Sequence, residues 1–389
     1  MRSHRRRAHS RAVKTLLDDD DLLAEILLRL PPQPSSLPRA SLVCKRWHSL
    51  ASNRGFSRRF RIHHRRKPPV LGFFDGYSCG FQPTLEPPNR VPPGRFSFQG
   101  GVGDRIESLG CRHGLVLIFN AERNHFLVWD TVTGDQRRVA IPSGLATRAD
   151  KLLINGAVFR EGGDAHFQVV LTVRENDDKQ RRRALACVYS SETGLWGDLI
   201  STPLPSKVPT SGYSVPTVVF PGKPSVLAGN SIYWMLIGNF NGILELNLEK
   251  QSLAVVRVPE RMLRFQFFMM RAEGGGLGLL LVTGSGIQLW KRNTDCDGSA
   301  SWALGRTVEL NKLLSLNSHT KIVIGFAEEN NVVFLWAGGP VFMVHLESLQ
   351  FKKLFETNIV SEYQPFESVF TTETGIGGGN DAADILHHP

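Results

Sequence analysis

One two-strand scheme recurs along the chain from about residue 70 onward. In each copy an alternating apolar strand ends in a polar turn, and a second strand leads away with an aromatic or aliphatic residue. Copies of the scheme lie at residues 126–142, 184–200, 242–259, 286–304 and 341–355. Equivalent positions, at intervals of 60, 57, 44 and 54 residues, are held by Trp129, Tyr189, Leu246, Trp290 and Val344. A period of about 50 residues is typical of the four-stranded blades of a β-propeller.

The recurring copies predict a large all-β domain, of kelch-like β-propeller type, over residues 71–370. Five copies are visible, and degenerate copies could hide in 71–120, 205–230 or 305–340, so we expect six to eight blades. The 37 glycines and 22 prolines agree with a chain of many turns. Residues 371–389 are expected to form a flexible tail.

The tryptophans and a glycine-rich stretch of this domain have structural interpretations. Six of the seven tryptophans lie there, mostly within the recurring strands, and we expect them to pack between blades rather than to line a ligand-binding aromatic cage. Residues 272–286, AEGGGLGLLLVTGSG, lack the glycine spacings of phosphate-binding loops. They predict a turn followed by a strand.

Ahead of this domain, residues 18–50 carry apolar side chains at helical spacing. Asp18 to Asp21 suit the first turn of a helix, where carboxylates satisfy free backbone N–H groups, and Pro31-Pro32 ends that helix. The apolar stripe of this helix consists of Leu22, Leu23, Ile26, Leu27 and Leu30.

A second helical stretch follows the two prolines. Ser35 or Ser36 can cap it, with Pro38 in its first turn. Its apolar side consists of Ala40, Val43, Cys44, Trp47 and Leu50. Two or three short helices bury too little surface to enclose both stripes, and each leucine left in water forgoes about 1.5–3 kcal/mol. We therefore expect the segment to dock on the rest of the chain or on another protein.

The net charge of +10 is concentrated near the N-terminus. Residues 1–67 hold 17 Lys and Arg against 5 Asp and Glu, a net of +12, which leaves 29 against 31, or −2, for residues 68–389. We interpret residues 1–14 as a disordered basic arm and residues 57–70 as a basic linker behind a helical domain at 15–56. A solvated arm and linker are favoured over phosphate binding, because charge alone gives only nonspecific attraction.

The sequence contains no recognisable catalytic motif. It lacks the G-x-S-x-G elbow, the H-E-x-x-H zinc motif, a kinase-type catalytic loop and a phosphate-cradling glycine loop. His63-His64 and His387-His388 are expected to be solvated rather than metal ligands. We therefore expect neither a metal nor a cofactor.

The cysteines and the apolar runs bear on location. The five cysteines lie far apart without a CxxC pair, which indicates reduced thiols. The sequence shows no apolar run long enough to cross a bilayer and no secretory signal, so we expect a protein of the cytoplasm, the nucleus or both, with no membrane partner.

The helical segment closely resembles the F-box, the module that attaches substrate receptors to the Skp-type adaptor of cullin–RING ubiquitin ligases. The resemblance rests on LLAEILLRLPPQPSSLPRASLVCKRWHSLAS, with its Leu-Leu-x-Glu-Ile-Leu run, its Leu-Pro and its Val-Cys-Lys-Arg-Trp. The stretches RRKPPVLGFF, YSSETGLW and NSIYWMLIGNFNGILELNLEKQSLAVVRVP are more loosely similar to plant F-box proteins with a propeller-like F-box-associated domain.

The resemblance implies a set of adaptor-facing positions. They are Leu22, Leu23, Ile26, Leu27, Leu30, Pro31, Leu37, Leu42, Val43, Cys44 and Trp47. Many F-boxes open with Leu-Pro just ahead of the acidic residues, whereas here Leu17 is followed directly by Asp18. Leu17 is expected to supply the leucine contact without the proline.

The sequence as a whole predicts a noncatalytic receptor subunit of a Skp–cullin–F-box ubiquitin ligase, whose propeller presents an unknown protein substrate. One alternative is a nucleic-acid-binding protein that uses residues 1–14 and 57–67, with steeply salt-dependent binding. Another is a propeller enzyme or sugar-binding module, which needs convergent acids, histidines or metal ligands at one mouth of the propeller.

Overall fold

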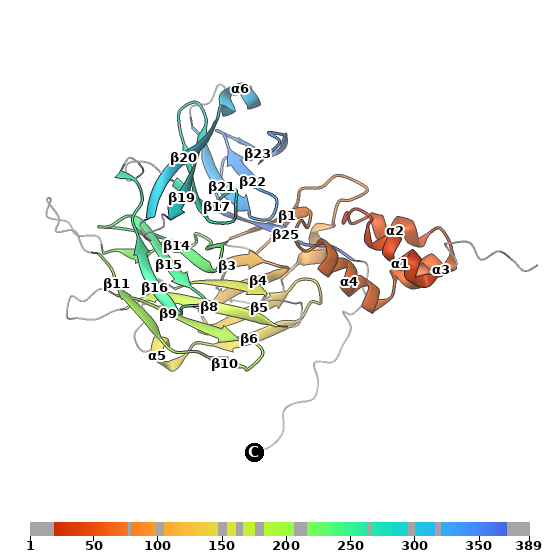
Figure 1. Ribbon diagram of the computed structural model, residues 1–389, viewed down its shortest axis with the longest axis horizontal. Helices are drawn as coiled ribbons and strands as arrows, with labels where there is room; N and C mark the ends of the chain where they lie inside the picture. Colours follow the sequence, from red (N-terminus) through yellow and green to blue (C-terminus); the bar gives the residue numbers. More distant parts are fainter. Residues whose placement is uncertain are drawn as a thin grey trace, which may run out of the picture. The chain divides into compact units, whose positions relative to one another are not determined.

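The computed structural model describes residues 19–76, 79–98, 105–146, 154–160, 166–175, 183–205, 216–260, 262, 267–294, 300–315 and 320–371. The chain divides into two compact units (Figure 1). The helical unit has residues 19–64 and 369–371 among those described, and the β-rich unit spans Arg65–Ser368. The predicted arm at 1–14, and all of the predicted tail except Thr371, lie outside the described residues.

The helical unit contains four helices among its described residues. They are α1 (Asp20–Leu28), α2 (Ser36–Ser41), α3 (Lys45–Ala51) and α4 (Arg54–His64). Helix α1 begins in the predicted acidic run, because the Asp19 carboxylate accepts the backbone N–H groups of Asp21 at 2.9 Å and Leu22 at 3.4 Å. The two predicted helices are confirmed, the second as α2 followed by α3.

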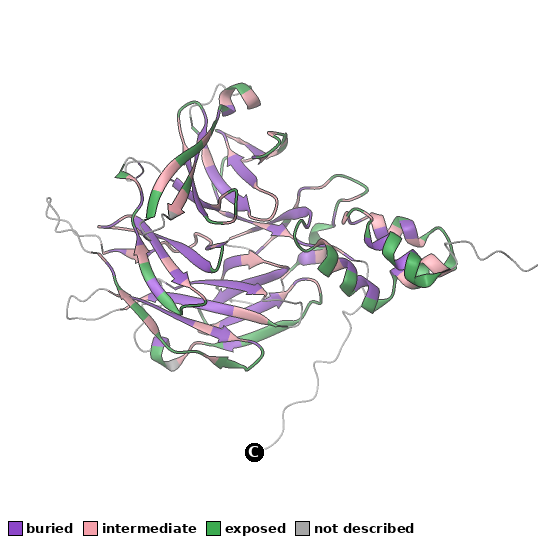
Figure 2. Cartoon of the chain, viewed as in Figure 1, coloured by how far each residue is buried: buried purple, intermediate pink, exposed green. Residues whose placement is uncertain are grey.

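Helix α4 supplies the apolar surface that the first three helices lack. Phe56 and Phe60, one helical turn apart on α4, are buried against Leu23 and Leu27 of α1, together with Val369 from the end of the chain. The expectation that residues 18–50 dock on the rest of the chain or on another protein is confirmed for Leu23 and Leu27, which are fully buried in a cluster with residues outside that segment. Figure 2 shows buried and exposed residues alternating along these helices.

The segment predicted as a basic linker, residues 57–70, begins inside α4. Its first eight residues, 57–64, are helical, and its last residue, Val70, opens a strand. Phe60 is buried there, whereas Arg58 and Arg59 are exposed. A sequence in which charged residues surround one aromatic residue at each helical turn forms an amphipathic helix. The linker prediction considered only the charges, so it did not identify this helix.

The β-rich unit holds six antiparallel sheets among its described residues, here named blades 1 to 6. Blade 1 consists of β3 (Ile106–Arg112), β4 (Leu115–Asn120), β5 (His125–Asp130) and β6 (Gln136–Ala140). Blade 2 consists of β7 (Asn155–Arg160), β8 (Phe167–Arg174), β9 (Arg183–Ser190), β10 (Leu195–Trp196) and β11 (Ile200–Pro203). Blade 3 consists of β12 (Val218–Val219), β13 (Val226–Ala228), β14 (Ser231–Ile237), β15 (Gly242–Asn247) and β16 (Ser252–Val256).

The remaining blades complete the ring. Blade 4 consists of β17 (Phe267–Arg271), β18 (Leu277–Val282), β19 (Ile287–Thr294) and β20 (Ala300–Val308). Blade 5 consists of β21 (Ile322–Ala327), β22 (Val332–Trp336), β23 (Pro340–His345) and β24 (Phe351–Glu356). Blade 6 consists of β25 (Tyr363–Glu367), β1 (Val70–Asp75) and β2 (Phe81–Pro83). Short helices in the connections are η2 (Pro93–Phe96), α5 (Ser143–Ala146) and α6 (Leu310–Leu314).

The architecture is thus a six-bladed β-propeller, within the predicted range of six to eight. Each recurring copy in the sequence is the third strand of a blade with the strand or strands that follow it, and Trp129, Tyr189, Leu246, Trp290 and Val344 all lie in third strands. Blade 6, which the recurrence did not reveal, pairs the first strand of the domain, β1, with the last, β25. The kelch-like subtype stays a prediction.

The second strands are continuous apolar runs, because neighbouring blades cover both of their faces. All six residues of β4 are buried, and Trp234 of β14 is fully buried in the cluster between blades 2 and 3. Trp129 lies 5.8 Å from Phe74 of blade 6, between ring centroids. For these tryptophans the predicted packing between blades is confirmed. The turn at Ala272–Gly276 followed by β18 agrees with the prediction for the glycine-rich stretch.

The polar turn of the recurring scheme has a common backbone conformation. Gly134 and Gly194 have φ of 84° and 74°, and the equivalent residues Gln251 and Leu349 have φ of 48° and 57°. This left-handed region costs a residue with a Cβ roughly 1–2 kcal/mol. Two copies of the turn therefore carry strain that glycine removes in the other two.

Replacing Gln251 by Gly is expected to raise the free energy of unfolding by about 0.5–1 kcal/mol, since relief of the left-handed strain exceeds the entropic cost of glycine. Urea unfolding of the full chain measures the change. The matched control is Lys250→Gly at the preceding exposed position, where φ is not positive and glycine should destabilise by about 0.5–1 kcal/mol. Equal effects of the two substitutions would contradict the interpretation.

Candidate functional site

The helical unit presents apolar side chains to solvent on one surface, here called the docking face. It consists of Leu22 and Ile26 on α1 and of Leu42 and Val43 in the turn between α2 and α3. Leu42 is 84% and Val43 63% exposed. An ion pair of 2.7 Å between Arg46 Nε and Asp20 Oδ1 joins the first turn of α3, which directly follows these residues, to the start of α1. Helices α1 and α3 thus hold an apolar surface that the unit's own core does not cover.

The structure separates the predicted adaptor-facing residues into three groups. The exposed ones are Leu22, Ile26, Pro31, Leu42, Val43 and Cys44. The half-buried ones, packed on the core of the helical unit, are Leu30 and Trp47. The buried ones are Leu23, Leu27 and Leu37. Leu17 lies outside the described residues.

Helix α4 carries the basic side chains of the nucleic-acid alternative. Arg54, Arg58 and Arg59 are exposed, and Arg59 contacts Glu25 at 3.1 Å. The aromatic side chains of α4, Phe56 and Phe60, are buried, so neither offers a ring on which a base could stack. The histidine pair has a structural role in part: the half-buried His64 shares a hydrogen bond of 2.8 Å with the Leu28 carbonyl, and burial lowers the pKa of its imidazole.

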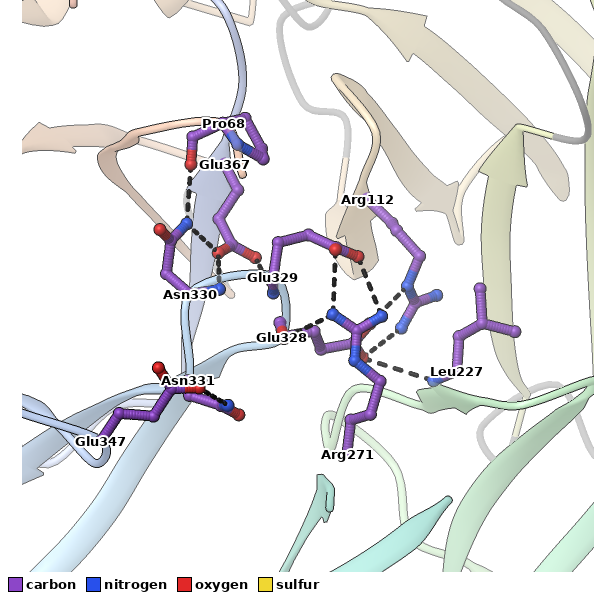
Figure 3. Close-up of polar contacts among 10 residues, drawn as sticks. All are labelled: Pro68, Arg112, Leu227, Arg271, Glu328, Glu329, Asn330, Asn331, Glu347 and Glu367. Carbon is purple, nitrogen blue, oxygen red and sulfur yellow. Dashed lines mark hydrogen bonds and ion pairs between the residues drawn. The ribbon is translucent and has the colours of Figure 1, made fainter. Parts of the chain in front are cut away.

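In the β-rich unit, charged residues converge where the inner strands of several blades end (Figure 3). Arg112, the last residue of β3, donates to Glu328 at 2.6 and 2.9 Å and to the Ser225 carbonyl at 3.0 Å. Arg271, the last residue of β17, donates to Glu329 at 2.9 and 3.2 Å. These bidentate pairs tie blades 1 and 4 to the β21–β22 turn of blade 5.

Glu367, the last residue of β25, joins blade 6 to the same turn. Its carboxylate accepts the backbone N–H groups of Glu329 at 3.1 Å and Asn330 at 2.9 Å, and the Asn330 side-chain amide at 2.7 Å. That amide also donates to the Pro68 carbonyl at 2.6 Å (Figure 3). Burial, with the neighbouring Glu329 and Glu328 carboxylates, raises the pKa of Glu367 to about 7, although its hydrogen bonds act in the opposite direction.

We call this end of the ring the linker end, because both chain ends of the β-rich unit lie here. The Ser368 backbone N–H donates to the Pro69 carbonyl at 3.2 Å, beside the Glu367 contacts. The opposite end, where the inner strands begin, is here called the loop end. It carries Glu107 of β3, Asn155 of β7 and Glu362, which precedes β25.

The inner strand of blade 3 is interrupted. Strands β12 and β13 both pair with β14, and between them residues 220–225, Phe-Pro-Gly-Lys-Pro-Ser, leave the sheet. We call this segment the plug, since its contacts reach four other blades. Asn155 of blade 2 donates to the carbonyls of Phe220 at 2.9 Å and Lys223 at 3.0 Å.

Further contacts place the plug among the inner strands of the ring. The Lys223 ammonium pairs with Glu362 next to blade 6 and lies 5.1 Å from the ring centroid of Phe268 in blade 4. The Ser225 carbonyl accepts a hydrogen bond from the Arg112 guanidinium of blade 1. The plug therefore runs from the loop end toward the linker end and occupies the place that an axial ligand would need.

Sequence reasoning did not find the plug. Residues 205–230 were predicted only as a possible site of a degenerate blade. The available signal was Pro221 and Pro224 within a short apolar run, because proline interrupts the hydrogen-bond ladder of an inner strand. The blades that the plug contacts could not be read from the sequence.

The described residues lack two kinds of feature. Among them no group of three or more His, Cys, Asp or Glu side chains is placed to hold a metal ion. Within the same residues no helix has both the length and the apolar character that a membrane crossing needs.

The comparisons with known families agree with this architecture. The model described as F-box domain matches residues 19–59, and the model described as F-box protein AT5G49610-like, beta-propeller matches residues 108–370. The chain is therefore an F-box protein with a β-propeller. Within that class it belongs to the AT5G49610-like family, whose model covers more than half of its length. No curated protein matches the chain.

Several solved structures are similar to part of this chain, each at low identity. The WD40 domain of SCAP from fission yeast is 13% identical, with 70% of this chain and 58% of that chain covered and a TM-score of 0.32. Apo AztD from Citrobacter koseri is 8% identical, with 66% and 72% covered and a TM-score of 0.31. A luciferin-regenerating enzyme is 9% identical, with 78% and 96% covered and a TM-score of 0.31.

The raised pKa of Glu367 predicts a pH dependence of stability. The folded chain binds this proton more tightly than the unfolded chain, so the contribution is full below pH 4.5 and is lost as the pH rises through about 7. Glu367→Gln removes it. Between about pH 5 and about pH 8, urea unfolding should show wild type losing up to about 3 kcal/mol more than the variant. Equal losses would contradict the assignment, since other carboxylates are common to both proteins.

Proposed function

We propose that this chain is a substrate receptor of a Skp–cullin–F-box ubiquitin ligase. F-box domains in general bind Skp-type adaptors, and the observation that carries the proposal is the docking face. Leu42 and Val43 remain in water although the same helical unit buries Leu23 and Leu27 completely. Covering each exposed side chain would contribute roughly 1.5–3 kcal/mol, which favours a protein partner at this face.

The proposed mechanism is proximity rather than bond chemistry. The helical unit binds the adaptor and through it a cullin, while the propeller binds the substrate. The chain thereby raises the effective concentration of substrate lysines near the ubiquitin-charged enzyme. No step of this mechanism requires a metal, a cofactor or a catalytic side chain of this chain.

The plug and the linker-end ion pairs support a binding role for the propeller. The alternative of a propeller enzyme or sugar-binding module requires acids, histidines or metal ligands that lie close together at one mouth of the ring. At the linker end, Arg112 and Arg271 are instead paired with Glu328 and Glu329, and the plug fills the place of an axial ligand. These contacts argue against chemistry on the axis at the linker end of the ring.

The proposed cellular location is the cytoplasm, the nucleus or both. Thiols remain reduced in these compartments, and Cys44, Cys79, Cys111 and Cys187 are free. The nucleic-acid alternative is less favoured, because the aromatic rings of α4 are buried and its exposed arginines alone supply only nonspecific attraction.

The docking face can be tested with Leu42→Ala/Val43→Ala in the full chain. Removal of two exposed apolar side chains should weaken binding to a purified Skp-type adaptor at least 10-fold, at about 1.4 kcal/mol per factor of ten. Isothermal titration calorimetry measures the Kd. Thermal unfolding should be unchanged, since both side chains lie outside the core.

Leu195→Ala/Leu199→Ala is the matched control, because it removes two exposed leucines from blade 2 and should leave the Kd unchanged. Unweakened binding by the Leu42/Val43 variant would overturn the proposal. Replacement of Leu30 and Trp47, two of the adaptor-facing positions that the resemblance implies, is a poorer test. Both side chains pack on the core of the helical unit, so their loss would also destabilise the fold.

A further inference from the structure

The two ends of the ring differ in the length of their connections. At the linker end, successive strands are joined by short turns such as His113–Gly114 and Glu328–Asn331. The segments that lead from one blade to the next begin and end at the loop end, and several are long: residues 141–154, 204–217, 257–266 and 309–321 separate successive blades in the sequence, and residues 357–362 join β24 to β25. Long connections on a rigid scaffold are where proteins place recognition residues. Strand β3, which spans the two ends, has seven residues, so the loop end lies about 20 Å from the linker end.

One connection at the loop end, residues 357–362, is described in full and is fixed on both sides. The Thr357 N–H donates to the Gly339 carbonyl and Trp336 Nε1 to the Thr357 carbonyl, each at 2.8 Å. At its other side, Ser361 Oγ donates to Asp75 Oδ2 at 2.9 Å. The segment is therefore held by blade 5 and by blade 6 before any partner binds.

Two apolar side chains project from this fixed segment. Ile359 is 74% and Val360 44% exposed, and the Ile359 N–H is itself held by Thr357 Oγ1 at 3.1 Å. Isolated exposed apolar residues are ordinary, but an adjacent pair on a hydrogen-bonded segment is pre-organised, so little ordering entropy opposes binding to it.

Uncompensated negative charge lies next to this pair. Lys223 takes one oxygen of Glu362, and the other, Oε2, is buried without a hydrogen-bond partner among the described residues. Glu107 of the neighbouring blade 1 is half-buried, and its carboxylate makes no hydrogen bond within the described part of the chain. A Cβ on Gly222 of the plug would lie 3.8 Å from Glu107 Oε1, so both carboxylates border residues 222–223 of the plug. Lys223 is thus paired with Glu362, while Glu107 has only the nearby charge of Arg105, without a hydrogen bond to it.

Strand pairing connects the two carboxylates to the apolar pair. The Ser108 N–H, next to Glu107, donates to the Gly76 carbonyl at 3.1 Å, and the Gly76 N–H donates to the Glu362 carbonyl at 3.2 Å. Burial raises the pKa of both Glu107 and Glu362, as expected where a charge is incompletely matched. A cationic group from outside would complete the pairing.

We propose that Ile359, Val360, Glu362 and Glu107 form a docking site for an extended segment of the substrate protein, in which an apolar residue lies next to a lysine or arginine. The apolar side chain packs on Ile359 and Val360, and the cation pairs with the half-buried Glu107 carboxylate beside Glu362. This inference rests on the proposed receptor function. It assigns the substrate to the end of the ring opposite Pro69 and Ser368, where both chain ends of the β-rich unit lie.

The test uses the full chain and a display library of random short peptides as the probe. Wild type should select peptides that pair an apolar residue with a neighbouring Lys or Arg. Ile359→Ser/Val360→Ser should weaken binding of the selected peptides at least 10-fold, with the Kd measured by fluorescence anisotropy. Glu107→Gln should abolish the preference for Lys or Arg over Gln in matched peptides with little change in the unfolding temperature, because this carboxylate has no hydrogen bond to lose within the described part of the chain and its interaction with Arg105 is only electrostatic.

Leu195→Ser, at a 67% exposed leucine of blade 2, is the control and should bind the selected peptides as wild type does. The inference is overturned by selection of acidic or purely polar peptides, or by selected peptides that bind the Ile359/Val360 variant as tightly as wild type. All of these variants should bind the Skp-type adaptor with unchanged Kd. Failure of the docking-face test would instead be seen in adaptor binding, so the two failures are distinguishable.

Discussion

Closure of the ring by β25 and β1 is the constraint on which the rest of the propeller depends. The two strands come from opposite ends of the domain and form blade 6 with β2. This blade has three strands, and its edge strand β2 is short. Glu367 strengthens the closure at its weakest place, because one carboxylate holds the β21–β22 turn and, through Asn330, the backbone at Pro68. The linker-end ion pairs and the plug can form only when the blades of this ring are held next to one another.

The interior of the ring uses polar contacts for geometry more than for stability. Arg112 and Glu328 are each nearly removed from water, and the desolvation of such a pair offsets much of its attraction. What the pair provides is a fixed distance between blades that are not neighbours in sequence. The plug acts in the same way, since its backbone carbonyls accept Asn155 and Arg112 from two different blades.

The sequence allowed prediction of those parts of the fold that depend on local pattern. The outer strands of blades 1 to 5 were found because their turns repeat and their apolar residues alternate. The plug and blade 6 were missed, since Lys223 meets Glu362 and Val70 meets Glu367 only after the chain has closed on itself. In the helical unit, the spacing of apolar residues located the stripes but could not separate buried from exposed positions. It therefore gave Leu22 and Leu23 the same role, although Leu23 is buried and Leu22 is exposed. Leu23 is buried because Phe56 and Phe60 of α4 pack in the same core, and α4 was not predicted because its segment is highly charged.

The end of the chain completes both units, which constrains when the protein can mature. Strand β25 ends at Glu367, and two residues later Val369 enters the core of the helical unit. During synthesis, neither the ring nor the helical core can be finished until residues 363–369 have left the ribosome. A chain that stops short of them would lack the closing strand and would also have a gap in the core that α1 and α4 share. Completion of the helical core and completion of the propeller are thus linked through one short stretch of the chain.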